Sequence, residues 1–170
     1  MAPTYNLKLV KAPDPILTKK VPYLHFSEWN VVELGNEMLD VMRASKGIGL
    51  AANQVNINAA IFVMGSADIP GFPQSLIIVN PQILDLSEDV SRDMEGCLSF
   101  PELYFAVARP SWVKAKFQDE FGQEKEMTFT DYVARCFLHE FDHLQGRCFT
   151  DGMSKFKIER LRKQYKKKIK

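Results

Sequence analysis

The sequence predicts an α+β fold, with mixed and antiparallel sheets packed around a central helix that carries the pattern HExxH and a further helix at the C-terminus. Three observations support this class. The runs "AAIFVMG" and "SLIIVNPQIL" have the length and composition of strands. Residues 113–129 alternate around the turn sequence "DEFG", as a hairpin does. Elsewhere apolar residues recur at helical spacing.

The segment before the first strand is predicted to be a helix followed by a loop. The helix starts after Ser27 as N-cap and ends at Gly47. Its apolar residues are Val31, Leu34, Met38 and Met42. The stretch "GIGLAANQ", residues 47–54, is expected to be a loop. In the strand of residues 75–84, Pro81 cannot donate to a ladder, so this part is expected at a sheet edge.

The HExxH helix has clear start and stop signals. We expect it to run from Asp131, after Thr130 as N-cap, to Gln145. Gly146 then takes the left-handed conformation that ends a helix.

The C-terminal helix, residues 154–170 with Ser154 as N-cap, carries most of the positive charge. Residues 155–170 hold nine Lys and Arg against the single Glu159, a local charge of +8, which leaves 13 basic and 20 acidic residues, or −7, in the body. An apolar stripe on the helix consists of Ile158, Leu161, Tyr165 and Ile169. The helix either docks by this stripe with its lysines in solvent, or contacts RNA or an acidic partner electrostatically.

Length and composition indicate one domain, residues 1–170, because 46% hydrophobic content suffices for a real core. No apolar run approaches the roughly 20 residues that span a bilayer. The N-terminus lacks the apolar region of a secretory signal. Three scattered cysteines do not resemble a disulfide framework and indicate a reducing, intracellular compartment.

The stretch "HEFDH" places two histidines four residues apart. On a helix, His139 and His143 lie on one face, one turn apart, where two imidazoles can bind one metal ion. With Glu140 beside them, the pattern is typical of a hydrolytic metal site in which the glutamate moves the protons. The alternative is a helix whose histidines border the core and whose acidic residues, including Asp142, face solvent or form salt bridges.

Several residues compete to be the third ligand of such a site. Cys136 shares the helix face but lies about 10.5 Å along the axis from His143, too far for a short thiol, and is better placed in a wall of the site. The extended protease pattern would need histidine at Phe149. Cys148, just beyond the helix, and the early His25 remain candidates.

Cys97 stands in a more favourable context, "EGCLSFPE". Gly96 lets the main chain approach closely, and Leu98 offers a main-chain N–H that can stabilise an oxyanion. A strand-borne thiolate meeting the histidine pair would complete a Cys-His-His site with one open position, which suits catalysis. By itself the stretch is equally compatible with a turn around a buried cysteine.

Three motifs together resemble those of the peptide deformylases. "GIGLAANQ" (47–54), "EGCLS" (95–99) and "HEFDHLQG" (139–146) match in order and spacing, and "APDPIL" (12–17) resembles the family's N-terminal Pro-Asp segment. The likeness covers most of the chain. It implies a monomeric metal hydrolase that removes the formyl group from the initiator formyl-methionine of nascent chains and releases formate.

The resemblance implies a role for each matched residue. The metal, usually Fe²⁺ with Zn²⁺, Ni²⁺ and Co²⁺ as other candidates, would be held by Cys97, His139 and His143. Glu140 would be the general acid and base, and the Gln54 amide and Leu98 N–H would bind the developing oxyanion. Ile48 and Gly49 are implied to line and hydrogen-bond the first substrate residue, and we expect an apolar pocket near Ile48 and Cys136 for its side chain.

This sequence also departs from the family pattern. Leu138 and Tyr104 stand where many relatives have glutamine and arginine, which leaves the substrate preference beyond the first residue open. Glu95 and Arg109 match a pair that braces the cysteine strand in relatives, with a surface ion pair as the alternative.

Two other functions remain to be distinguished: an HExxH metallopeptidase, and a ribosome-associated binding module with a relict site. The family docks at the ribosome through its C-terminal helix, so the basic helix here is a candidate for ribosome contact. A cytoplasmic location is expected, with an organellar or viral source as the alternative.

Overall fold

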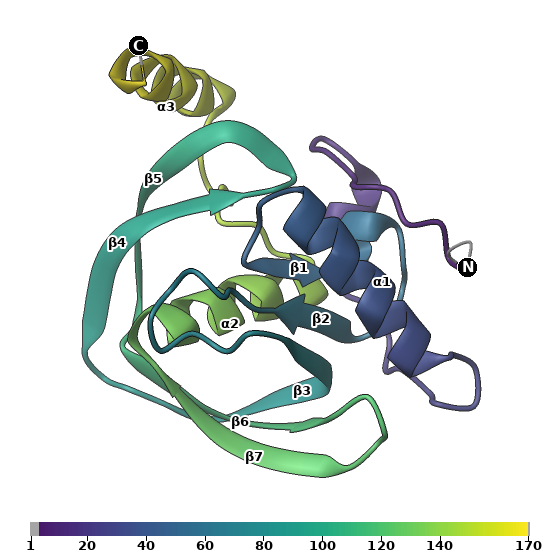
Figure 1. The fold of residues 1–170 in the computed structure, drawn as a ribbon. Helices are drawn as coiled ribbons and strands as arrows, with labels where there is room; N and C mark the ends of the chain where they lie inside the picture. Colours follow the sequence, from purple (N-terminus) through teal and green to yellow (C-terminus); the bar gives the residue numbers. More distant parts are fainter. Residues whose placement is uncertain (1–3, 170) are drawn as a thin grey trace.

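Figure 1 shows the fold in a computed structural model, which describes residues 4–169. The helices are α1 (Val31–Ala44), α2 (Asp131–Leu144) and α3 (Lys155–Lys168), with short 3₁₀ turns η1 (Pro15–Thr18) and η2 (Ala52–Val55). The strands are β1 (Gly49–Ala51), β2 (Ile61–Met64), β3 (Leu76–Leu86), β4 (Val90–Cys97), β5 (Phe100–Pro110), β6 (Trp112–Gln118) and β7 (Glu124–Thr130). The predicted α+β class is confirmed.

The strands form two antiparallel sheets. The larger has the order β1-β2-β3-β6-β7, and β4 pairs with β5 in a separate two-stranded sheet. The predicted hairpin over residues 113–129 is confirmed as β6 and β7. β3 as a whole is the central strand of this sheet. Its part from Pro81 on lies beyond the pairing with β2, which ends at Val79, and has only β6 as a neighbour, so the expected edge is local, at a shift of register between Val79 and Gln82.

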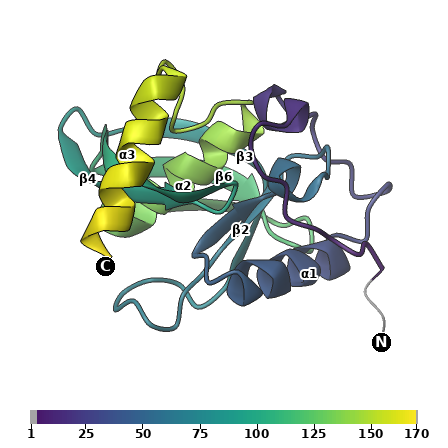
Figure 2. The same ribbon diagram turned by 90° about the horizontal axis from the view of Figure 1, so that it is seen from above.

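The two long internal helices lie on opposite faces of the larger sheet (Figure 2). In β2, Phe62 faces the apolar cluster that contains Phe137 of α2, with ring centroids 5.2 Å apart. The neighbouring Val63 faces the cluster that contains Met38 of α1. Because both faces of β2 are buried, its sequence is a continuous apolar run instead of an alternating one.

The limits of α2 agree with the sequence signals to within one residue. The helix begins at Asp131 after Thr130 and ends at Leu144. Gly146 has a φ of 71°, the left-handed conformation predicted for it. A side chain there would also meet the main chain, because a Cβ would lie 2.7 Å from the Lys19 carbonyl carbon.

The predicted caps of α1 are wrong. The helix starts at Val31, where the Asn30 side chain, and not that of Ser27, accepts from a main-chain N–H of the first turn. It ends at Ala44, and Lys46, with a φ of 58°, takes the left-handed conformation expected of Gly47. Gly47 instead gives room to Leu98, since a Cβ at this position would lie 2.6 Å from Leu98 Cδ1 and the leucine side chain would have to move.

The prediction of a loop over residues 47–54 is also wrong. Gly49–Ala51 forms β1, paired with β2 along the register Leu50↔Val63, and η2 follows directly. The segment is buried, and buried peptide groups need hydrogen-bond partners, which β2 supplies. Local composition does not reveal a partner strand that lies elsewhere in the chain.

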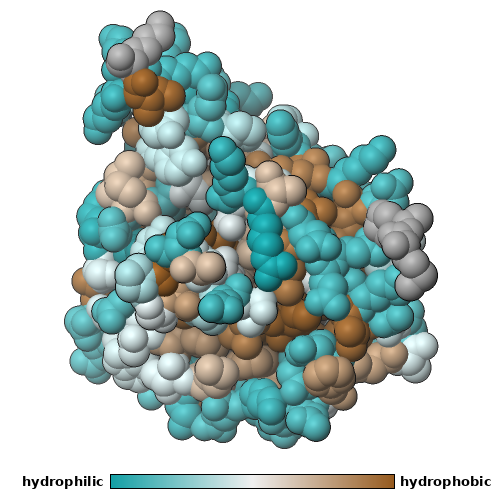
Figure 3. Space-filling view, in the orientation of Figure 1, coloured by the Kyte–Doolittle hydropathy of each residue, from teal (hydrophilic) through white to brown (hydrophobic). Residues whose placement is uncertain are grey.

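Helix α3 docks on β5 by most of its predicted stripe. Ser154 caps it, as expected, and Ile158 and Leu161 pack against the apolar cluster of Leu103 and Phe105. Ile169, by contrast, is 62% exposed, so the stripe does not dock along its whole length. Hydrophilic side chains cover the rest of the helix, at the top left of Figure 3.

Within residues 4–169, none of the helices has the length and apolarity needed to cross a bilayer.

Candidate active site

Strand β4 and helix α2 bring one thiol and two imidazoles together. The candidate donor atoms of Cys97, His139 and His143 lie within 4.8 Å of one another, and both histidines are buried. Cys97 Sγ is 3.3 Å from His143 Nε2. A thiolate with two imidazoles suits a divalent transition metal, and three protein ligands leave one position open. This group can therefore hold a metal ion.

An irregularity in the β4–β5 hairpin brings Cys97 to the helix. The register shifts between Glu95 and Cys97, so that Cys97 pairs with Phe100 across the two-residue turn of Leu98 and Ser99. A shift of this kind re-aims a side chain relative to a regular ladder.

The other candidate ligands lie outside the cluster. The Cys136 thiol is 3.6 Å from the Ile48 carbonyl oxygen, in the wall of the cavity beside the cluster. Cys148 lies 3.7 Å from the Leu17 carbonyl oxygen, and burial raises the pKa of its thiol to about 12. His25 is exposed and packs on Tyr23.

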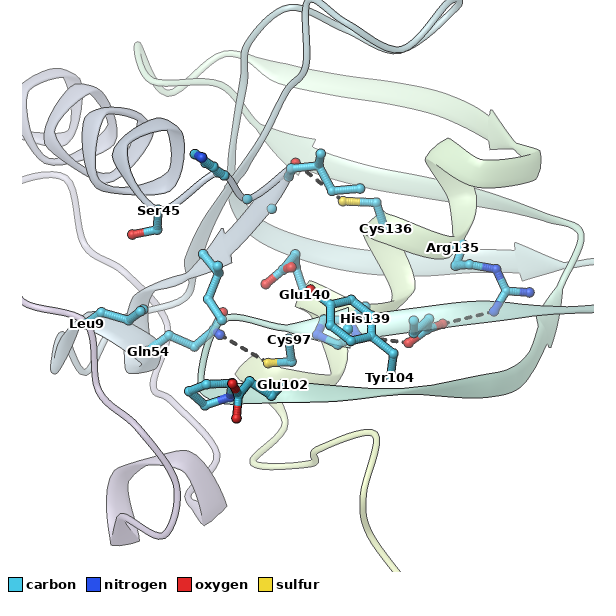
Figure 4. Close-up of a pocket in the computed structure, with 18 of the residues that line it drawn as sticks. Leu9, Ser45, Gln54, Cys97, Glu102, Tyr104, Arg135, Cys136, His139 and Glu140 are labelled. Carbon is cyan, nitrogen blue, oxygen red and sulfur yellow. Dashed lines mark hydrogen bonds and ion pairs between the residues drawn. The ribbon is translucent and has the colours of Figure 1, made fainter. Parts of the chain in front are cut away.

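Glu95 connects His139 to two buried arginines. Its carboxylate is 2.9 Å from His139 Nδ1 and 3.0 Å from Arg135 Nη1 (Figure 4). It also pairs with Arg109. Burial favours the neutral acid, but the hydrogen bonds with His139 and Arg109 lower the pKa of Glu95 to about 2. An ionised Glu95 accepts a hydrogen bond from Nδ1–H, which leaves the lone pair of His139 Nε2 free to bind a metal ion. Glu95 and Arg109 are thus a buried pair, not a surface pair. Asp142 lies behind them, 2.9 Å from Arg109 Nη1.

Glu140 is buried beside the cluster, and its Oε2 has no hydrogen-bond partner among residues 4–169. Burial raises the pKa of this carboxyl group to about 7. A buried polar atom without a partner is costly unless a ligand, ion or water contacts it. Gly49 makes room for Glu140, because a Cβ at position 49 would lie 2.5 Å from Glu140 Oε1.

Gln54 has a fixed amide orientation. Its Oε1 accepts from the Ala51 N–H at 2.9 Å, so Nε2 points the other way, 3.4 Å from Cys97 Sγ and 3.1 Å from Ser99 Oγ. The side chain is buried, and its Nε2 lies at the edge of the cluster of Cys97, His139 and His143. Leu98, which follows Cys97, lines the same cavity.

A cavity of about 500 Å³ lies next to the cluster, lined among others by Ile48, Gly49 and Cys136. Strand β1 is at the edge of the larger sheet. The Ile48 carbonyl accepts from Gly65 N–H at 2.9 Å on the side of β2, so by alternation the peptide groups of Gly49 point away from β2. Tyr104 lines the cavity and is 41% exposed, whereas Leu138 is buried in the core.

Three polar residues of this region were not identified from the sequence. Arg135 completes the contacts of Glu95, Ser99 accepts from Gln54, and Asn53 Nδ2 donates to the His143 carbonyl at 2.6 Å. Arg135 had a detectable signal, because it lies four residues before His139 on the same helix. Ser99 and Asn53 lie inside the recognised motifs, but their partners are distant in sequence.

Comparison with known proteins points to one family. The model of the family described as polypeptide deformylase matches residues 6–159. A chloroplastic peptide deformylase 1B of rice is 41% identical over 160 residues, which cover 94% of this chain and 60% of the rice protein. The chain therefore spans less than two thirds of that relative. A peptide deformylase of Bartonella tribocorum is 37% identical over 167 residues, covering 95% of this chain and 92% of the bacterial protein.

A solved structure agrees with the sequence matches. The peptide deformylase of Acinetobacter baumannii bound to Met-Ala-Ser superposes with a TM-score of 0.80 at 31% identity. The match covers 85% of this chain and 96% of the bacterial one.

Proposed function

Because this chain belongs to the polypeptide deformylase family, we propose that it hydrolyses the formyl group from the N-terminal formyl-methionine of nascent polypeptides. Water attacks the formyl carbon, the C–N bond breaks, and formate and a free amine are released. The observation that carries this proposal is the cluster of Cys97, His139 and His143 beside the unpartnered oxygen of Glu140. The bound Met-Ala-Ser of the Acinetobacter relative supports a peptide with free N-terminal methionine as product.

Cys97, His139 and His143 would hold one divalent ion per chain. We propose Fe²⁺, and the same donors also accept Zn²⁺, Ni²⁺ or Co²⁺. Such an ion supplies Lewis acidity, which lowers the pKa of water and polarises the formyl carbonyl. Glu95 keeps His139 in the tautomer that presents Nε2 to the cluster.

Glu140 is proposed as the general base and acid. Its unpartnered Oε2 takes a proton from the attacking water and returns it to the departing amine. Burial raises the pKa of this carboxyl group, which makes its carboxylate a better proton acceptor than an exposed one.

Gln54 and Leu98 are proposed to stabilise the negative charge that develops on the formyl oxygen. The Nε2 of Gln54 is a neutral donor held in place by the Ala51 N–H, so little reorganisation is needed during the reaction. The main-chain N–H of Leu98, next to Cys97, is the second proposed donor.

The first substrate residue is proposed to bind along β1. The outward peptide groups of Gly49 offer main-chain hydrogen bonds to an extended peptide. Ile48 and Cys136 line the adjoining cavity, which would take the unbranched methionine side chain.

Formate release from formyl-Met-Ala-Ser by the metal-loaded protein tests the function. Release of formate without peptide-bond cleavage is the expected result. Cleavage of internal peptide bonds would instead favour the HExxH metallopeptidase. Ribosome binding without either reaction would favour the binding module with a relict site.

The proposed setting is translation that starts with formyl-methionine. We place the protein in the cytoplasm, with an organelle or a virus-infected cell as alternative settings, and treat residues 1–170 as one monomeric catalytic domain. The exposed basic residues of α3 are proposed to contact the ribosome, whose RNA is negatively charged.

A further inference from the structure

Strand β5 supplies one wall of the cavity at its mouth. Glu102 and Tyr104 line the cavity but remain exposed, unlike the buried histidines (Figure 4). The Tyr104 ring lies against the main chain of Gly96, so closely that a Cβ at Gly96 would clash with the ring. The ring is therefore held against the residue that precedes Cys97, in the exposed part of the cavity wall.

The last turns of α3 contact both of these residues. The Tyr165 ring stacks on that of Tyr104, with centroids 4.6 Å apart and planes at 30°. Lys166 Nζ lies 2.9 Å from Glu102 Oε2. Earlier in the helix, Leu161 packs against the apolar cluster of β5, which anchors the helix beside this wall. Since the ion pair is half-exposed, the ring stack is the stronger constraint.

We propose that α3 takes part in substrate selection: Tyr165 positions Tyr104 as an aromatic wall for the side chain of the second substrate residue. The inference rests on the proposed function, which places the first residue deep in the cavity beside Gly49 and Cys136. The following residue then leaves through the mouth, where the exposed part of the Tyr104 ring, 41% of the side chain, offers an apolar contact. A large apolar second residue gains that contact, whereas a small one does not.

The test compares formyl-Met-Phe-Ser with formyl-Met-Ala-Ser. The wild-type protein is expected to have a lower KM for the phenylalanine peptide. Tyr165→Ala frees the Tyr104 ring and should reduce the ratio of kcat/KM values about fivefold, mainly through KM. Tyr165→Phe retains the stack and should restore the ratio. Tyr104→Ala should abolish the preference.

Three more variants of α3 complete the test, and Phe156→Ala and Lys167→Ala are its matched controls. Phe156 is on the same helix, 78% exposed, and Phe156→Ala should leave the ratio unchanged. Lys166→Ala should lower the ratio less than Tyr165→Ala does, and Lys167→Ala should not lower it.

Some outcomes would overturn the proposal. An unchanged ratio in folded, metal-loaded Tyr165→Ala would do so, as would an equal loss for both peptides or a failure of Tyr165→Phe to restore the ratio. These results differ from a failure of the proposed function, in which the wild-type protein releases no formate from either peptide.

Discussion

Helices α2 and α3 have the same length, 14 residues each, but opposite surroundings. Nine residues of α2 are buried, including Arg135, His139, Glu140 and His143. No residue of α3 is buried, and its lysines and arginines face mainly solvent. Both helices carry charged side chains, but only in α2 are some of these side chains buried.

The difference shows why charge alone does not make a reactive site. In α2, a buried charged group either has a partner, as Arg135 has in Glu95, or has an oxygen without a hydrogen-bond partner, as Glu140 has. Electrostatic interactions are much stronger in such an environment than in water. In α3, solvent and salt screen the charges, so they can guide association but do little to shift a pKa. Changes in α2 and its partners should therefore have much larger effects than changes in α3.

Loss of the thiolate should have the largest effect. Cys97→Ala leaves a two-histidine site, which should hold metal weakly and lose essentially all formate release. Metal content per chain and formate release are the measurements. Cys136→Ala and Cys148→Ala are the controls and should keep one metal per chain. Tight metal binding by Cys97→Ala with loss in Cys148→Ala would contradict the assignment.

Glu140→Ala should separate metal binding from turnover. Because Glu140 moves protons without being a proposed ligand, the variant should retain metal and lose about 10²- to 10⁴-fold in kcat. Metal analysis and steady-state kinetics measure the two effects. A variant with near wild-type kcat would exclude Glu140 as the general base.

Glu95→Gln tests the partners of the buried charges. The change leaves Arg109 and Arg135 buried without their carboxylate, and breaking a buried pair costs about 3–5 kcal/mol of unfolding free energy. The matched control is Glu159→Gln on α3, where the exposed pair with Arg162 should contribute at most about 1 kcal/mol. Denaturant unfolding of both variants gives the comparison. An equal loss of unfolding free energy in the two variants would contradict the conclusion that buried charge pairs around α2 matter more than the exposed pair on α3.

The apolar cavity should distinguish first residues by size. Burying a methionine side chain contributes about 2 kcal/mol, so formyl-Ala-Ala-Ser should be roughly 30-fold poorer in kcat/KM than formyl-Met-Ala-Ser. Competition between the two peptides measures this ratio directly. Equal kcat/KM values for the two peptides would show that Ile48 and Cys136 do not form the pocket for the methionine side chain.

Neutralising exposed lysines of α3 should have the smallest effect. Removing the whole helix would also expose the β5 cluster, so the triple change to glutamine at Lys163, Lys167 and Lys168 is the sharper test. Ribosome binding should weaken several-fold at low salt and converge with wild type at high salt. The control is the same change at three lysines of β6 and β7, namely the exposed Lys114 and Lys125 and the half-buried Lys116. Equal weakening in both variants would indicate a general charge effect instead of a docking helix.

Sequence alone determined the features that depend on neighbours along the chain. The limits of α2 follow from the apolar periodicity and the glycine at position 146, and the β6–β7 hairpin from its alternation and turn. Helical spacing places His139 and His143 on one face wherever the helix lies. The likeness to the deformylase motifs then identified Cys97 as their partner, 42 and 46 residues before them.

Only the tertiary structure decided the features that depend on distant partners. Whether residues 49–51 are loop or strand was settled by pairing with β2, because buried peptide groups must find hydrogen-bond partners. Whether Glu95 lies at the surface or in the core was settled by Arg109 and Arg135, which reach it from β5 and α2. The contact of Tyr104 with Tyr165 joins residues 61 positions apart in the chain. Burial and charge pairing depend on what surrounds a side chain in space, which its neighbours in sequence do not specify.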